Sequence, residues 1–152
     1  MNYLLDTNAA GYFMEQRTSI VARVRQIGGP GLISVSTITL AELRYGIGIM
    51  PEGRKKTRLM DSLEHMLGAG MEVRPFSVDA ARVYAEVGAA LRRAGMACGF
   101  QDLAIASIAI VENKTLASND GFFDHVQRLC GLRFERWDLE PDHLECTLDN
   151  PE

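Results

Sequence analysis

The sequence contains little of what most redox, zinc and membrane proteins depend on. Its three cysteines form no C-x-x-C pair, and its three histidines fall in no metal-ligand spacing. A disulfide framework or a zinc site is therefore not expected, and the odd number of thiols is typical of a reducing compartment, which predicts a cytoplasmic protein. No apolar run reaches the length of a transmembrane helix, so no membrane partner is expected.

Low-complexity tracts, internal repeats and Ser/Pro-rich linkers are also missing. At 152 residues, of which 47% are hydrophobic and 24% charged, the chain has the length and composition of one globular domain with a sizeable core. The sequence has no G-x-S-x-G, P-loop or G-x-G-x-x-G motif. The nucleophilic and nucleotide-binding enzymes that carry those motifs are therefore not indicated.

Positive charge is absent from the C-terminal end of the chain. Residues 138–152 hold six of the 20 acids and no lysine or arginine, which leaves 14 acids against 16 bases in residues 1–137. We therefore divide the chain into a domain over residues 1–137 and an acidic C-terminal extension over 138–152. The acidic net charge of −4 consequently does not argue against a phosphate-bearing substrate.

Segments with the patterns of strands and helices alternate along the domain. This alternation predicts an α/β fold with a central, mostly parallel sheet flanked by helices. The expected strands are residues 2–5, 32–35, 72–75, 115–118 and 132–135. The expected helices are residues 7–15, 18–28, 37–50, 51–67, 78–94 and 101–112.

Two acids follow directly on expected strands. Asp6 ends the first apolar run, and Asp120 follows residues 115–118. In a parallel sheet both acids would project from the carboxyl edge, where open α/β folds bind ligands. Each also has a structural alternative, because Asp6 can cap the next helix and the Asn119-Asp120-Gly121 segment is a good turn sequence.

Two further acids lie on expected helices. Glu42 falls in a helix stripe with the apolar side chains of Ile38, Tyr45 and Ile49, where a lone carboxylate would be costly. The alternative to a functional role is a buried ion pair with Arg44 of a neighbouring molecule or with Arg82. Asp102 opens a helix that is apolar nearly all round, and favourable interaction with the helix dipole would also explain an acid there.

Four carboxylates at one edge would need a cation to offset their repulsion. Oxygen ligands without cysteine or histidine favour Mg²⁺ or Mn²⁺. Such ions commonly complete their coordination with phosphate oxygens and activate water for in-line displacement, so metal-assisted phosphodiester hydrolysis is the chemistry that follows.

Four motifs in this order resemble the PIN-domain ribonucleases, and most of all the VapC-type toxins of bacterial toxin–antitoxin pairs. The resemblance spans about residues 2–137, and its motifs are Leu4-Leu5-Asp6-Thr7-Asn8, Thr39-Leu40-Ala41-Glu42-Leu43-Arg44-Tyr45-Gly46, Asp102-Leu103-Ala104-Ile105-Ala106 and Ser118-Asn119-Asp120-Gly121-Phe122-Phe123. It implies a parallel sheet flanked by helices and an endoribonuclease, commonly a homodimer, that a cognate antitoxin inhibits by lying across the cleft.

The resemblance also implies roles for individual residues. The metal-site acids correspond to Asp6, Glu42, Asp102 and Asp120, with Mg²⁺ or Mn²⁺ as the cofactor. The polar residues that support the site through hydrogen bonds correspond to Thr7, Asn8 and Ser118.

Two other functions compete with the ribonuclease. A haloacid-dehalogenase-type phosphatase also begins with a strand and an aspartate, but it needs a second acid two positions later, where this chain has Asn8. A noncatalytic RNA- or protein-binding module of the same fold would have no use for four mutually repelling acids. The densest basic groups, residues 54–58 and 92–93, are either solvated helix faces or contacts for RNA phosphates.

Overall fold

The computed structural model describes residues 1–138, and the predicted acidic extension lies outside them except for Asp138. Within that part the strands are β1 (Tyr3–Leu5), β2 (Ile33–Ser36), β3 (Glu72–Arg74), β4 (Thr115–Ser118) and β5 (Phe134–Arg136). The helices are α1 (Thr7–Met14), α2 (Thr18–Gln26), α3 (Thr37–Gly48), α4 (Arg54–Gly68), α5 (Val78–Arg93), α6 (Phe100–Val111) and α7 (Phe122–Cys130), with a short 3₁₀ turn η1 (Pro30–Leu32). No helix among these residues is long and apolar enough to cross a membrane.

The strands form one sheet in the order β3-β2-β1-β4-β5, and every neighbouring pair is parallel. All five carboxyl ends therefore lie along the same edge of the sheet. The predicted fold class is confirmed, because strands and helices alternate and the sheet is parallel throughout. Strands β1 and β4 are neighbours, which brings the segments after Leu5 and Ser118 together although they are far apart in the sequence.

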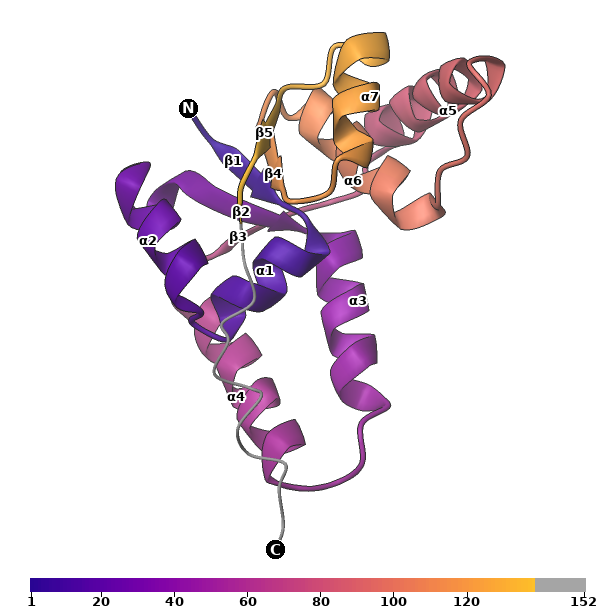
Figure 1. The fold of residues 1–152 in the computed structure, drawn as a ribbon. Coiled ribbons are helices and arrows are strands. Elements are labelled where there is room, and N and C mark those ends of the chain that lie inside the picture. Colours follow the sequence, from indigo (N-terminus) through magenta and orange to yellow (C-terminus); the bar gives the residue numbers. More distant parts are fainter. Residues whose placement is uncertain (139–152) are drawn as a thin grey trace, which may run out of the picture.

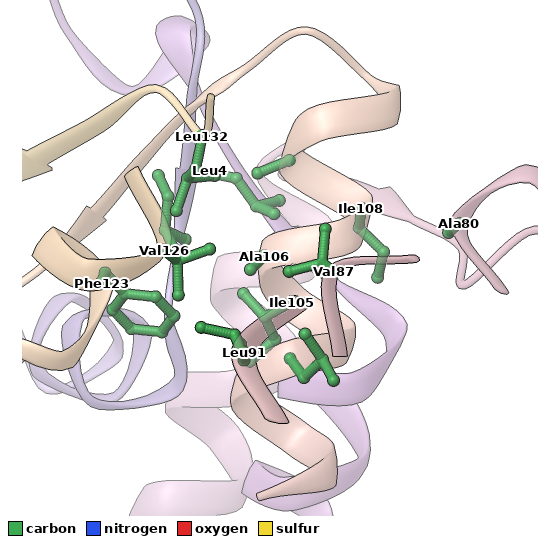
Figure 2. Close-up of a cluster of buried hydrophobic side chains, with 13 residues drawn as sticks. Leu4, Ala80, Val87, Leu91, Ile105, Ala106, Ile108, Phe123, Val126 and Leu132 are labelled. Carbon is green, nitrogen blue, oxygen red and sulfur yellow. The ribbon is translucent and has the colours of Figure 1, made fainter. Parts of the chain in front are cut away.

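Helices cover both faces of the sheet (Figure 1). On one face α5, α6 and α7 enclose a core in which Leu4, Ile105 and Phe123 are fully buried, as Figure 2 shows. On the other face α1 and α2 pack over Leu5 and the neighbouring strands. Alternate residues of β1 thus serve opposite cores, as the two-residue period of a strand requires.

Helices α3 and α4 extend away from the sheet as a pair joined by a loop (Figure 1). A smaller core is formed where the pair packs against the end of α1, and its buried residues are Met14, Ile47, Leu59, Leu63 and Met66. The sequence places the start of α4 at Pro51, but the helix begins at Arg54 because Gly53, with a φ of 158°, is its N-terminal cap.

Helix α7 was not expected from the sequence. The Asn119-Asp120-Gly121 segment does make a turn, but it leads directly into a helix in which Phe123 and Val126 are buried. Their three-residue spacing on one face is the signal that would have predicted it. The other expected strands and helices are confirmed, with boundaries shifted by at most a few residues.

Candidate active site

Asp6 lies at the carboxyl edge, between the end of β1 and the start of α1. Its Oδ1 accepts a hydrogen bond of 2.9 Å from the backbone N–H of Ala9, which makes it the N-cap of α1. Its Oδ2 accepts a hydrogen bond from the hydroxyl of Ser118 at the end of β4. The capping alternative is therefore correct, but it uses only one carboxylate oxygen, and the second is held across the sheet.

Ser118 connects Asp6 to Asp120. The same Ser118 hydroxyl oxygen accepts the backbone N–H of Asp120 at 2.9 Å, so it contacts both segments that follow β1 and β4. Asp120 is exposed, and its Oδ1 accepts the backbone N–H of Phe122 at 2.9 Å. The turn alternative for Asp120 is thus also met, while its other oxygen takes no part in that bond.

Glu42 does not lie in a buried apolar stripe, and this expectation was wrong. Tyr45 and Ile49 on the same stripe of α3 are 70% and 68% exposed. The half-buried Glu42 carboxylate instead accepts a hydrogen bond of 2.7 Å from the hydroxyl of Thr7. Because Thr7 directly follows Asp6, this bond ties α3 to the carboxyl end of β1.

The ion pairs weighed as an alternative for Glu42 are made by other acids. Nη2 of Arg44 lies 2.9 Å from Oε1 of Glu64, and Nη1 of Arg82 lies 3.1 Å from Oδ1 of Asp79. Within residues 1–138, none of the four candidate acids forms an ion pair with an arginine or lysine.

Thr39 supports the site and was missed as a functional residue. Its buried side-chain oxygen lies 3.3 Å from that of Thr7 and accepts a hydrogen bond of 3.2 Å from the hydroxyl of Ser36, the N-cap of α3. A chain of hydroxyls therefore leads from the end of β2 to Glu42. A serine directly after an apolar strand, with a threonine three residues later, is a helix-start signal that predicts the cap but not the contact with Thr7.

The side chains of Asp102 and Asn8 form no hydrogen bond with the other candidate site residues within residues 1–138. Asp102 is half-buried in the first turn of α6, as the sequence predicts. Burial raises the pKa of Asp102, and the negative charges of Asp120 and Glu42 raise it further. Asn8 is exposed in the first turn of α1.

The four acids lie close enough for their charges to interact. The pKa of Asp6 is raised to about 6, mainly because burial disfavours its carboxylate. The hydrogen bonds that Asp6 accepts oppose this rise, and the charges of Asp102 and Asp120 add to it. The pKa of the Cys98 thiol is raised to about 11. Burial is the main cause, and the negative charges of Asp102 and Asp120 add to the rise.

The residues present fit a hard divalent cation. The candidate donors are carboxylate oxygens with no cationic partner in residues 1–138. Burial disfavours the charge of Asp6, and a bound cation would offset both this cost and the smaller repulsion from Asp102 and Asp120. As placed, no three histidine, cysteine, aspartate or glutamate side chains of these residues enclose a metal position. Mg²⁺ needs no such cage, because it keeps several waters and binds through one or two carboxylates.

A groove of about 1020 Å³ lies apart from these acids. Its wall is formed by α1, α4 and the turn at η1, with apolar residues such as Phe13 and Met66 and the cations Arg54 and Arg58. None of the four acids lines it. A smaller hollow of about 660 Å³ between α5 and the start of α6 is lined in part by Cys98.

The chain is similar to known proteins over most of its length. The sequence matches the PIN domain over residues 3–129. It is 33% identical to "Ribonuclease VapC2" of Rickettsia felis over 139 residues, which are 91% of this chain and 99% of that protein.

Solved structures have the same fold. The crystal structure of VapBC2 from Rickettsia felis bound to a DNA fragment from their promoter contains a chain with a TM-score of 0.75 and 32% identity, covering 91% of this chain and 100% of that one. VapBC-5 of Mycobacterium tuberculosis, described as a member of the VapBC family of toxin-antitoxin systems, gives a TM-score of 0.67 and 25% identity over 91% of this chain and 98% of that one.

Proposed function

The chain belongs to the PIN-domain family, among the VapC ribonucleases, and from this premise we propose that it is the toxin of a toxin–antitoxin pair. Its reaction is the endonucleolytic hydrolysis of RNA phosphodiester bonds, with Mg²⁺ or Mn²⁺ as the cofactor, in the cytoplasm. The observation that supports the proposal is the Ser118 hydroxyl, which binds both Asp6 and the backbone of Asp120 and so joins the segments after β1 and β4 at the carboxyl edge. The negative charges of Asp102 and Asp120 raise the pKa of Asp6, and those of Asp120 and Glu42 raise the pKa of Asp102.

In this proposal Asp6, Glu42, Asp102 and Asp120 form the metal site, in which one or two of the carboxylates would bind the ion directly and the others would bind its waters. When bound there, a divalent ion supplies an activated water and stabilises the charge that develops on the leaving oxygen. Asp6 has to be ionised to bind it, and above about pH 6 this carboxyl loses its proton.

Hydroxyl groups hold two of the acids in place. Ser118 orients Asp6, and Thr7 orients Glu42, each through a hydrogen bond to one carboxylate oxygen. The bond from Thr7 leaves the second oxygen of Glu42 for a ligand. Both oxygens of Asp6 already accept one hydrogen bond, so a ligand there would use their remaining lone pairs. Such supporting bonds around metal ligands commonly contribute about 10–100-fold in metal affinity or activity. Asn8, exposed beside Thr7, is proposed to contact substrate or water rather than another site residue.

The partners of the proposed toxin are RNA, a cognate antitoxin and a second copy of the chain. The groove between α1 and α4 offers the antitoxin an apolar surface with a cationic rim at Arg54 and Arg58, which favours a segment with apolar and acidic side chains. Exposed Tyr45 and Ile49 on α3 favour burial against a second subunit.

RNA cleavage tests this function. Purified protein is incubated with single-stranded RNA in EDTA, and then with Mg²⁺ or Mn²⁺ in excess. We expect cleavage only with the metal, and a loss of more than about 100-fold in Asp102→Asn, since a metal ligand contributes at least as much as the residues that support it. Asp79→Asn is the matched control, because Asp79 is likewise an acid in the first turn of a helix. It should cleave like the unmodified protein.

Each competing function predicts a different result. Undiminished cleavage in EDTA would contradict the metal assignment, and RNA binding without turnover would favour the noncatalytic module. Hydrolysis of a small phosphomonoester such as p-nitrophenyl phosphate, with no cleavage of RNA, would favour the phosphatase. A large loss of folding in Asp102→Asn, measured by thermal unfolding, would make Asp102 a structural residue.

A further inference from the structure

We propose that Arg136 is a positioning residue that binds the RNA backbone beside the scissile phosphodiester. This inference rests on the proposed ribonuclease function and adds a specific contact to it. It concerns a residue outside the four acids and outside the hydroxyls that support them.

The register of the sheet places Arg136 at the carboxyl edge. Arg136 is the last residue of β5 and is paired with Ser118 of β4, the residue whose hydroxyl binds Asp6. Directly paired residues of parallel strands point to the same face. The preceding pair on that face, Leu116 and Phe134, packs into the core beneath α7. Arg136 therefore continues this row at the point where the core ends and solvent begins.

The guanidinium group lies over the turn that carries Asp120. Its Nη1 is 3.6 Å from the position that a Cβ would take on Gly121, the residue after Asp120. A side chain larger than a methyl group at that position would displace the guanidinium. Oδ2 of Asp124 lies 3.9 Å from the same position. The cation therefore lies at the turn that carries Asp120 rather than extending away from it.

The charge of Arg136 is not used within residues 1–138. Arg136 forms no ion pair with any described acid, and it shares this property with several exposed arginines such as Arg133. Arg136 differs from Arg133 in its place, because it lies at the carboxyl edge beside the turn that carries Asp120. Its side chain is exposed at the rim of the candidate site. A free guanidinium there can donate two parallel hydrogen bonds to a phosphate group.

The site has a physical need for such a cation. Four carboxylates repel an approaching phosphodiester until a metal ion offsets their charge, and one divalent ion offsets only half of it. A guanidinium at the turn that carries Asp120 would attract the phosphate to the edge and align it. The chemistry recognised is a phosphate of the RNA backbone, so the contact sets position and affinity but reads no base.

Cleavage kinetics of three variants test this role. Arg136→Gln removes the positive charge, and Arg136→Lys keeps the charge but lacks the planar guanidinium group. Arg133→Gln is the matched control, because Arg133 is also exposed and directly precedes the other end of β5. Cleavage of a fluorescent single-stranded RNA is measured at saturating Mg²⁺ across a KCl series, with thermal unfolding of each variant.

We expect Arg136→Gln to lower kcat/KM by at least about tenfold, the effect of losing one charge-assisted hydrogen bond. Most of the loss should be in KM, and Arg136→Lys should recover part of it. The slope of log(kcat/KM) against log[KCl] should fall by about 0.7, the value for one phosphate contact to a single strand. Arg133→Gln should behave as the unmodified protein.

Two results would overturn the inference while leaving the ribonuclease intact. One is Arg136→Gln cleaving RNA as fast as Arg133→Gln. The other is a loss of activity with an unchanged salt slope and a lowered Tm, which would make Arg136 a structural partner of the turn at Asp120. If the unmodified protein cleaves no RNA at all, the proposed function fails and this inference fails with it.

Discussion

Asp6 is the residue whose environment most clearly combines structure and chemistry. As a helix cap it accepts the N–H of Ala9, and as a buried acid coupled to other acids it has a pKa of about 6. The cap stabilises the fold in either protonation state of the second oxygen. The ionised form, in contrast, is disfavoured until a cation is present. Changing the pH or adding a metal ion should therefore affect the ionised carboxylate of Asp6 without removing its role as a helix cap.

The pH dependence of stability follows from the sign of this shift. The folded state holds the Asp6 proton more tightly than the unfolded chain does. The stability that this protonated carboxyl contributes to the fold is therefore fully present below about pH 4 and is lost as the pH rises to about 6. In EDTA, Asp6→Asn should therefore gain stability relative to the unmodified protein between these values, by up to about 3 kcal/mol.

Urea unfolding at pH 4.5 and pH 7.5 in EDTA measures this difference. Asn is also a good N-cap, so the capping bond is kept in the variant. Asp61→Asn, at an exposed position of α4, is the control and should show no such change with pH. A difference between Asp6→Asn and the unmodified protein that stays constant across pH would show that Asp6 titrates normally.

The residue scale is also where prediction from sequence was least complete. The four acids could be selected because each lies beside an apolar segment, and Ser118 was implied by the family resemblance. The bond from Thr7 to Glu42 and the contact of Thr7 with Thr39 depend instead on how α3 packs against α1. No local pattern determines that packing. The stripe on α3 was misread for the same reason, because periodicity identifies a face but not what covers it.

At the scale of elements, the approach of α5 to α6 depends on Gly88. A Cβ on Gly88 would lie 3.0 Å from Cδ2 of Leu103, the residue after Asp102, so a larger side chain would force the two helices apart. Gly46 in α3 has no neighbour within 4 Å of a Cβ. One glycine is therefore required by packing, whereas the other only weakens its helix.

Substitutions at these two glycines should act in opposite directions. We expect Gly88→Leu to lower the free energy of unfolding by about 1–3 kcal/mol, as overpacked cores do. Gly46→Ala should raise it by about 0.5–1 kcal/mol, the difference in helix preference between the two residues. Urea unfolding of both variants measures this, and a Gly88→Leu protein as stable as Gly46→Ala would contradict the packing.

The order and type of most elements could be predicted because the signals are local. Ser36 and Ser77 directly precede two of the expected helices, and each accepts an N–H from the third residue after it. Helix α7 was not predicted, because the turn sequence at residues 119–121 suggested a loop, although Phe123 and Val126 after it have the spacing of one helix face. The strand order could not be predicted, since it depends on contacts between distant segments.

At the scale of the whole molecule, parallel strands collect acids from distant parts of the sequence at one edge. Helices on both faces leave that edge as the place where β1 and β4 end side by side (Figure 1). The acids there have no cationic partner in residues 1–138, while the acids elsewhere commonly do. The proposed hydrolysis of RNA therefore depends on a divalent ion bound at this edge.

Binding of Mn²⁺, followed by the electron paramagnetic resonance signal of the free ion, measures this most directly. At pH 7.5 the unmodified protein and Asp79→Asn should bind Mn²⁺ alike. Asp6→Asn and Asp102→Asn should bind it at least about tenfold more weakly, because each loses a carboxylate that the ion needs. Equal Mn²⁺ binding by all four proteins, or none by the unmodified protein, would contradict the account.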